Sequence, residues 1–273
     1  MKNNITENFL IRLLILIIFF SVLIRCIAII NTPLELSPDE AQYWLWSKNL
    51  SWGYFSKPPL IAWLINLSNL IFGDYDFAVR IFAPILHGIT ALIIFYLSRE
   101  IISDSVSHFL SSLIWLTLPI VGVGSFLMST DTPLMLIWTI SLLLIVRAYK
   151  AENKTNWIIA GLFSGIGIYA KYAAIYFMVC LLFLILLDKH FRRILFNNLM
   201  GFGLCVLCAF IIIFPNILWN IENDWITLQH TSDNANFTNI KINLIRGLEF
   251  LLIQVFMLGP FMVVGGLVGI TKV

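Results

Sequence analysis

The chain has 273 residues, of which 60% are hydrophobic and only 12% are charged, and its mean hydropathy is +0.92. A soluble domain is closer to half apolar and a quarter charged, so this composition excludes an ordinary water-soluble protein and indicates one with lipid as its solvent. The net charge of +2 gives no reason to expect a nucleic acid as a partner. Membrane lipids are therefore the first partner that the sequence predicts.

Long apolar runs predict about eight membrane spans, because one crossing takes about 20 apolar residues. Six runs are nearly uninterrupted: Phe9–Ile30, Phe77–Leu97, Phe109–Met128, Pro133–Tyr149, Leu195–Phe214 and Leu244–Ile270. A further run, Trp157–Leu187, would be roughly 46 Å long as one helix at 1.5 Å per residue, too long for a hydrocarbon core of ~30 Å. We expect two short spans there, meeting near Lys171. The predicted fold class is all-α, a polytopic transmembrane helical bundle.

The distribution of charge between the loops predicts which side of the membrane each loop faces. With a cytoplasmic N-terminus, the cytoplasmic loops collect these cations: Lys2, Arg99, Lys150, Lys154, Lys189, Arg192 and Arg193. The other side collects these acids: Asp39, Glu40, Asp74, Asp76, Asp131, Asp224 and Asp233. Because cytoplasmic loops carry the excess of Lys and Arg, the acidic side is predicted to be external, which in a bacterial inner membrane is the periplasmic face.

A long external segment, Leu34 to Asp76, follows the first span. Its apolar stretch Pro58–Phe72 has about 15 residues, and a crossing there would turn Lys189–Arg193 to the outside. We therefore expect this stretch to lie along the outer surface as an amphipathic helix. With the helix start at Ser37, the segment is predicted to hold two short interfacial helices. Connections of this length are usually functional or disordered.

Acidic and basic side chains gather on the external side. Asp39 and Glu40 stand in SPDEAQYW and Asp131 in STDTP, where each could also serve as a helix-start residue. Lys57, held before two prolines, suits an anionic lipid headgroup or snorkels to the interface. Lys171 lies between apolar spans, where an ionisable residue is by default a functional hypothesis. A carboxylate that takes a proton and lysines that neutralise a departing phosphate suit group transfer from a phosphate carrier.

The last external segment, Pro215 to Asn236, combines amides, acids and aromatic rings. Among them are Asn220, Asp224 and His230. Rings stack on the apolar faces of sugars and polar groups bond their hydroxyls, so this composition suits a sugar site. It is equally the composition of a wet loop, and His230 is as well explained as a plain loop histidine.

These segments resemble a known family. The string SPDEAQYWLWSKNLSWGYFSKPPLIAWLINLSNLIFGDYDFAVR is similar to the first external loop of PMT-type GT-C glycosyltransferases, which include bacterial protein mannosyltransferase-like enzymes and lipid A aminoarabinose transferases. The strings MSTDTPLMLIW, GIGIYAKYAAIY and PNILWNIENDWITLQHTSDNA match the bacterial branch in order and spacing. The resemblance covers roughly residues 9 to 260. It implies one GT-C-type transmembrane domain over residues 1–273.

The resemblance also implies an activity and its participants. The donor would be a polyprenyl-phosphate-linked sugar, with no need for a nucleotide sugar. The acceptor would be an external lipid A, polysaccharide or protein, and the transfer would invert the anomeric centre. Asp39 would be the catalytic base, supported by Glu40, and Asp131 the second acidic catalytic position. The substrate-binding candidates are Lys57, Tyr54, Lys171, Tyr172, Asn220, Asp224 and His230.

The metal requirement and the completeness of the chain are less defined. Some relatives carry an acidic residue where this chain has Ser56, so the ligands of a divalent metal are unknown and no cofactor is assigned. Some also place an arginine soon after the position of His230, whereas the next cation here is Lys241. Because family members usually continue for several more spans, the chain is expected to be C-terminally incomplete.

Two alternatives to an enzyme stay open. The first is a flippase or transporter of lipid-linked sugars. Transporters usually place their coupling charges near the midplane on broken helices, whereas the charges here gather at one surface, with Arg25 the main exception. The second is a non-catalytic truncated remnant, which would follow from the early end.

Overall fold

The computed structural model describes residues 2–151, 153–235, 243–259, 262–263 and 265–266. Within these ranges the chain is helical and contains no strand, so the all-α prediction is confirmed. The α-helices are α1 Lys2–Asn31, α2 Pro38–Ser47, α3 Leu60–Phe72, α4 Asp76–Arg80, α5 Phe82–Ile101, α6 Ser105–Thr117, α7 Pro119–Gly124, α8 Asp131–Ala151, α9 Lys154–Ala170, α10 Ile175–Leu187, α11 Lys189–Asn197, α12 Leu199–Glu222, α13 Ile226–Ala235 and α14 Leu244–Leu258. A 3-10 turn, η1, covers Tyr172–Ala174.

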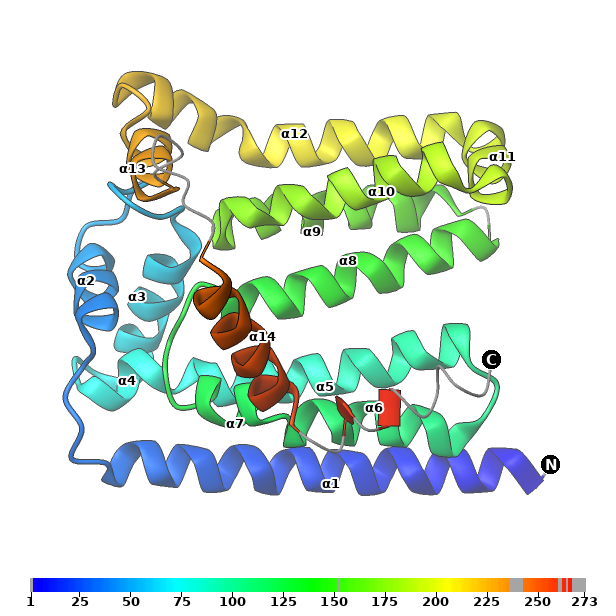
Figure 1. The fold of residues 1–273 in the computed structure, drawn as a ribbon, viewed down its shortest axis with the longest axis horizontal. Helices are drawn as coiled ribbons and strands as arrows, with labels where there is room; N and C mark the ends of the chain where they lie inside the picture. Colours follow the sequence, from blue (N-terminus) through cyan, green and yellow to red (C-terminus); the bar gives the residue numbers. More distant parts are fainter. Residues whose placement is uncertain (1, 152, 236–242, 260–261, 264, 267–273) are drawn as a thin grey trace.

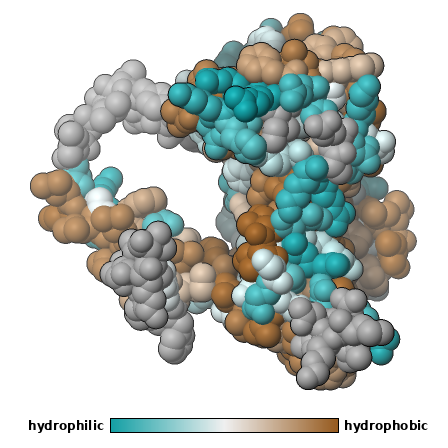
Figure 2. Space-filling view, turned by 90° about the vertical axis from the view of Figure 1, so that its right-hand side faces the viewer, coloured by the Kyte–Doolittle hydropathy of each residue, from teal (hydrophilic) through white to brown (hydrophobic). Residues whose placement is uncertain are grey.

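The long helices run along one axis of the molecule, and the short helices α2, α3, α4, α11 and α13 lie at its ends (Figure 1). Helices α2, α3, α4 and α13 lie at one end, which we call the site end. The opposite end carries the start of α1 and helix α11. Ion pairs join helices at that opposite end, with Arg99 bonded to Glu7 and Arg147 bonded to Glu100, each at 2.7 Å. Hydrophilic residues gather there between hydrophobic flanks (Figure 2).

Among the residues that the structure describes, four helical stretches are long and apolar enough to cross a membrane: Glu7–Asn31, Asp76–Ile101, Asp131–Lys150 and Leu199–Glu222. The bent pair Tyr172–Leu187 and Lys189–Asn197 would make a fifth. Helices α6, α9 and α10 have 13, 17 and 13 residues, short for a full crossing. The number of eight spans therefore stays a prediction. The predicted span Leu244–Ile270 begins as α14, and most of its second half lies outside the described residues.

Two predicted runs are each interrupted. The break near Lys171 is confirmed, because α9 ends at Ala170 and Lys171 is extended, with φ −161° and ψ 136°. The run Phe109–Met128 is not one helix but two, α6 and α7, which meet at Pro119. Proline lacks the amide hydrogen that a helix interior needs and pushes the preceding residue out of the helical region. Leu118 accordingly has ψ 131°.

The external segment folds as predicted into two short helices, α2 and α3. Buried residues of α3, including Ile61 and Ile65, pack against Tyr43 of α2 and Val79 of α4. The opposite side of α3 leaves Leu70 exposed. This packing attaches the external segment to the start of α5 at the site end.

Close packing of α9 against α12 fixes where both helices reach the site end. A Cβ atom on Gly161 would lie 2.2 Å from the carbonyl oxygen of Cys205, closer than real atoms approach. Only glycine therefore allows the two backbones to come this near, as is common where membrane helices pack. The contact sets the relative heights of Lys171, just after α9, and Asn216, near the end of α12.

Candidate active site

The first turn of α2 is held by a capping box. The Ser37 hydroxyl accepts a hydrogen bond from the Glu40 amide at 3.4 Å, and the Glu40 carboxylate accepts one from the Ser37 amide at 3.0 Å. Pro38 occupies the first helical position, where its missing amide hydrogen costs nothing. This arrangement fixes Asp39, the residue between Pro38 and Glu40, at the start of the helix.

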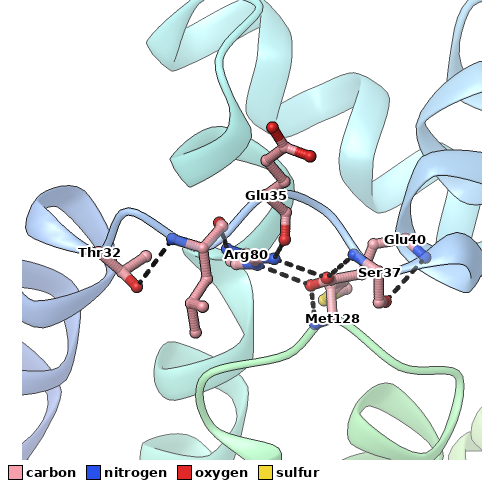
Figure 3. A network of polar contacts seen from close by, with 7 residues as sticks. Thr32, Glu35, Ser37, Glu40, Arg80 and Met128 are labelled. Carbon is pink, nitrogen blue, oxygen red and sulfur yellow. Dashed lines mark hydrogen bonds and ion pairs between the residues drawn. The ribbon is translucent and has the colours of Figure 1, made fainter.

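The Glu40 carboxylate is also the centre of a buried network (Figure 3). Arg80 donates to its two oxygens through Nε and Nη2, both at 2.9 Å, and the Met128 amide donates at 3.1 Å. Arg80 further donates to the carbonyls of Leu34 and Glu35 at 2.8 and 2.7 Å. Four donors thus converge on one carboxylate that is 1% exposed. This network joins the external segment, α4 and the approach to α8.

The environment of Glu40 favours its charged form. Burial by itself would raise the pKa of Glu40, but the hydrogen bonds from Arg80, Ser37 and Met128 hold that pKa below its ordinary value. With both oxygens occupied, Glu40 has no free position for an acceptor proton. Its geometry agrees with the supporting role implied by the resemblance, one of holding Asp39 and the segment before Asp131 in place.

Asp39 and Asp131 lie around one tyrosine. Tyr43, one turn after Asp39 on α2, is 2% exposed. Its pKa is raised to about 12, first by burial and then by the negative charges of Asp39, Asp131 and Glu40. The charges of Asp39 and Asp131 therefore both reach the phenol of Tyr43, although 92 positions separate the two residues in the sequence. The Asp39 side chain is exposed and makes no hydrogen bond or ion pair with any described residue.

Asp131 and Lys171 form an ion pair at the site end. The Lys171 ammonium lies 2.8 and 3.0 Å from the two carboxylate oxygens of Asp131. Asp131 begins α8, where the helix dipole favours a negative charge. Lys171 follows directly after α9, at the break between α9 and η1. Both side chains stay accessible, with exposed fractions of 55% and 36%.

Lys57 ends a loop that contacts α2. Its neighbour Ser56 donates to the Gln42 side chain at 3.5 Å. Gln42 lies three residues after Asp39 and therefore on the same side of the helix. The Lys57 side chain is half-buried and forms no hydrogen bond or ion pair with the residues that the structure describes.

Tyr54 supports the shape of this loop. Its hydroxyl accepts from the Ser51 amide and lies 3.1 Å from the carbonyl oxygens of Trp46 and Asn49. Its ring stacks on Trp46 with centroids 4.8 Å apart. Since Tyr54 is only 8% exposed, these contacts occupy the side chain that was predicted to bind substrate.

A buried amide links the two lysine-bearing segments. Asn216 of α12 donates to the carbonyl of Trp52 at 2.6 Å and accepts from the Tyr172 hydroxyl at 3.1 Å. Trp52 belongs to the loop of Lys57, and Tyr172 follows Lys171. Asn220 donates to the same Tyr172 hydroxyl at 3.0 Å. Tyr172 and Asn220 therefore hold each other, and Asn220 is 3% exposed.

The last two candidates lie where α12 turns into α13. Asp224 and Trp225 have φ of 53° and 57°, a left-handed conformation that reverses the chain. The Asp224 side chain is exposed on this turn. His230 lies on α13 with its ring edge against Phe55, centroids 4.7 Å apart. A hydrogen bond of 2.7 Å from Thr227 to the Tyr54 carbonyl fastens α13 over the Lys57 loop.

The predicted site residues therefore all lie at the site end, but some of their side chains are accessible and others are buried. Asp39, Asp131, Lys57 and Lys171 are reachable from the surface, and Tyr172 is half-buried. Glu40, Tyr54 and Asn220 are buried and support them. Their chemical roles stay predictions.

The sequence analysis missed Arg80, which neutralises Glu40. Its signal was present, because an ionisable residue within an apolar run is a functional hypothesis.

The acids and histidines do not form an evident metal centre. Within the described ranges, no three His, Cys, Asp or Glu side chains gather in a way that would hold an ion. Ser56, at the position where an acidic ligand was considered, contacts Gln42 instead.

Comparisons with known proteins identify the family and its relatives. A family model described as dolichyl-phosphate-mannose-protein mannosyltransferase matches residues 56–219. A lipid A galacturonosyltransferase of Rhizobium johnstonii is 32% identical over 223 residues, which are 81% of this chain and 46% of the relative. An undecaprenyl phosphate-alpha-4-amino-4-deoxy-L-arabinose arabinosyl transferase of Proteus mirabilis is 32% identical over 209 residues, 69% of this chain and 37% of the relative.

One solved structure shares the fold. The crystal structure of ArnT from Cupriavidus metallidurans in the apo state superposes with a TM-score of 0.63 at 16% identity, over 77% of this chain and 42% of that chain. The likeness shows the GT-C-type fold. The chain spans less than half the length of each of these three proteins.

Proposed function

We propose that this chain, which belongs to the dolichyl-phosphate-mannose-protein mannosyltransferase family, carries the active site of a membrane glycosyltransferase that moves a sugar from a polyprenyl-phosphate donor to an external acceptor. The observation that supports this most directly is the site end itself. There, two accessible carboxylates and two accessible lysines lie next to helices of membrane-spanning length. Cations are needed to neutralise the charge of a phosphate leaving group, and a base is needed to take the proton of the acceptor hydroxyl.

The reaction follows from these groups. The acceptor hydroxyl gives its proton to the carboxylate of Asp39, and its oxygen forms a bond to the anomeric carbon. The bond between that carbon and the phosphate oxygen breaks, and the electron pair leaves with the polyprenyl phosphate. Attack opposite the leaving group inverts the anomeric centre. Lys57 neutralises the charge that develops on the departing phosphate.

The remaining site residues hold this arrangement. Lys171, paired with Asp131, contributes a second positive charge beside the phosphate position. Glu40 and Arg80 fix the start of α2 and the approach to α8, so that Asp39 and Asp131 stay near each other. Preorganised charges of this kind stabilise a transition state without reorganisation at the moment of reaction.

The relatives favour particular substrates. One relative is named a lipid A galacturonosyltransferase. Another is named for an undecaprenyl-phosphate-linked aminoarabinose. We propose undecaprenyl phosphate as the carrier and lipid A as the first acceptor to test, with polysaccharide and protein as further acceptors. We place the site end at the periplasmic face of a bacterial inner membrane, since the loop cations gather at the other end.

The test is transfer by the purified chain in liposomes that contain lipid A and a sugar-loaded undecaprenyl phosphate, followed by mass spectrometry of lipid A. We expect Asp39→Asn to lower transfer by about 10²–10⁴-fold, the usual contribution of a general base. Asp104→Asn is the matched control. Asp104 caps α6 at the opposite end by accepting from the Ser107 amide, and asparagine caps equally well. Undiminished transfer by Asp39→Asn would contradict the assignment of the base.

A further inference from the structure

Helix α11 lies across the bundle at the end opposite the site end. It bends by 97° away from the stretch Tyr172–Leu187 that precedes it, and Figure 1 shows it end-on, while α10 and α12 run along the long axis. Leu187, the last residue of α10, is 80% exposed, as expected of a helix that faces lipid. A helix that lies perpendicular to membrane-spanning neighbours runs parallel to the membrane surface, where amphipathic helices bind.

One face of α11 is anchored to the bundle. Phe191 and Leu195, one turn apart, are 9% and 5% exposed and belong to the core cluster that contains Trp157 of α9. The Phe191 ring also stacks on Tyr149 of α8, with ring centroids 5.5 Å apart. Because residues spaced by four share a side of a helix, these contacts fix the rotation of α11 about its own axis. The opposite face is thereby held outward.

The outward face carries three cations and a phenylalanine. Spacings of three and four residues relate its members, which are Lys189, Arg192, Arg193 and Phe196. Lys189 and Arg193 are exposed, and their side chains form no hydrogen bond or ion pair with the residues that the structure describes. Arg192 is half-buried and donates to the Leu186 carbonyl at 3.4 Å. Phe196 is 59% exposed, so an apolar ring lies beside the free charges.

Two other arginines at this end are already neutralised. Arg99 and Arg147 each have a carboxylate partner at 2.7 Å. Residues 188–197, in contrast, hold three cations against one acid, Asp188. The Asp188 carboxylate caps α11 by accepting from two amides of its first turn, at 2.7 and 2.8 Å. The surplus positive charge of α11 is therefore without a counter-ion in the described part of the chain.

The neighbouring apolar residues decide which class of anion fits this surface. A soluble acidic partner would leave Phe196 and Leu187 in contact with water at the edge of the charged face. A phospholipid suits both features, because its phosphate meets the cations while its acyl chains cover the apolar side chains. Leaflets that contain anionic lipids attract basic segments that lie next to membrane spans.

We propose that the outward face of α11 binds the phosphate groups of anionic phospholipids, in the leaflet opposite the site end. Lys189 and Arg193 contact the headgroup phosphates, and Phe196 enters the boundary between the headgroups and the acyl chains. This surface lies at the other end of the molecule from Asp39 and Lys57, so it does not depend on the proposed transferase activity.

Phospholipids that differ only in headgroup charge test this surface. Purified full-length chain in mild detergent is titrated with phosphatidylglycerol or with phosphatidylcholine of the same acyl chains, and native mass spectrometry measures the bound fraction. Lys189→Gln with Arg193→Gln should weaken phosphatidylglycerol binding by about thirtyfold, roughly fivefold for each cation, and leave phosphatidylcholine binding unchanged. Raising the salt concentration should weaken phosphatidylglycerol binding by the wild type, because the contacts are exposed and therefore screened.

Three further variants locate the effect. Arg99→Gln with Arg147→Gln removes the same number of cations from the same end, but these arginines are paired, so we expect phosphatidylglycerol binding to stay close to that of the wild type. Lys57→Gln removes an accessible lysine of the site end, which also attracts an anionic headgroup, and should leave the contribution of α11 intact. Lys189→Arg with Arg193→Lys keeps both charges and should bind like the wild type. Should the double glutamine variant fail to fold, Lys189→Gln alone takes its place, with an expected loss of about fivefold.

The possible results either support or overturn the lipid surface. Loss of phosphatidylglycerol binding confined to the glutamine changes on α11 would support it. It would be overturned by a wild type without preference for phosphatidylglycerol, by a preference that salt does not reduce, by an equal loss in the arginine control, or by disappearance of the preference in Lys57→Gln. Because sugar transfer is not measured here, a failure of the proposed function is recognised separately, in the transfer assay.

Discussion

Removing the Glu40 carboxylate should destabilise the protein more than any change in the accessible site. Glu40→Ala leaves the guanidinium of Arg80, which is 3% exposed, buried without its counter-ion. It also removes the acceptor for the amides of Ser37 and Met128. The perturbation therefore breaks the contacts of the external segment with α4 and with the segment that leads to Asp131, together with the capping box of α2.

The expected loss of stability is large because the Glu40–Arg80 ion pair is buried. An exposed ion pair contributes at most about 1 kcal/mol, but breaking a buried pair by removing one partner typically costs about 3–5 kcal/mol, because a charge is left uncompensated. The Glu40–Arg80 pair has side-chain exposures of 1% and 4%, so the larger range applies. Removing both partners leaves no orphan charge. We therefore expect Glu40→Ala with Arg80→Ala to cost less than the sum of the single changes, by on the order of 2 kcal/mol.

The assay is unfolding by sodium dodecyl sulfate from mild detergent micelles, followed by tryptophan fluorescence, for the two single variants and the double variant. Glu35→Ala is the matched control. Arg80 contacts only the backbone carbonyl of Glu35, and Figure 3 shows the Glu35 carboxylate pointing away from the network. We expect its free energy of unfolding to stay within about 0.5 kcal/mol of wild type. Additive effects of Glu40→Ala and Arg80→Ala would refute the claim that one network holds both segments.

Three further predictions concern the site, its pH dependence and the helix packing. Lys171→Met should change the free energy of unfolding by less than about 1 kcal/mol, because its ion pair is exposed, yet lower transfer at least tenfold in the same preparation. The folded pKa of Glu40 is depressed, so its contribution to stability is complete above the unfolded pKa of about 4.3 and is lost as pH falls through the folded pKa. The difference in the free energy of unfolding between wild type and Glu40→Gln should therefore shrink as the pH is lowered below the unfolded pKa, and a constant difference would contradict this. Gly161→Ala should cost about 1–3 kcal/mol by overpacking against α12, whereas Gly203→Ala, where an added Cβ meets nothing within 4 Å, should have no such cost in parallel unfolding experiments.

Local sequence signals predicted the parts of the fold that depend on neighbouring residues. Ser37, Pro38 and Glu40 form the helix start that their order indicates, and the chain breaks at Lys171, as the length of the apolar run predicted. The GT-C fold was predicted from resemblance rather than from these rules. The number of spans was harder to predict, since α6 has only 13 residues where the apolar run Phe109–Met128 suggested one full span.

Contacts between distant residues could not be predicted from pattern alone. Glu40 and Arg80 are 40 positions apart, and nothing in the order of residues indicates that they meet. Asn220 was assigned to substrate because its type suits sugars, and Tyr54 because of the family resemblance, but neither ground reveals burial. Burial depends on how the Lys57 loop packs against α12 and α13, and that packing is a property of the assembled helices.

The four charged candidates Asp39, Lys57, Asp131 and Lys171 differ in whether their side chains are paired, and under the proposed function this difference decides which of them meets the phosphate. Asp131 and Lys171 neutralise each other at 2.8 Å. The side chains of Asp39 and Lys57 form no hydrogen bond or ion pair within the described part of the chain, although Ser56, next to Lys57, contacts the side of α2 that carries Asp39. If all four were paired, a phosphate would have to break an ion pair in order to bind. Under the proposed function, Lys57 is therefore the cation that meets the phosphate without first losing an ion-pair partner among the described residues, and Asp39 is the carboxylate that takes the acceptor proton, while Lys171 acts from within its pair with Asp131.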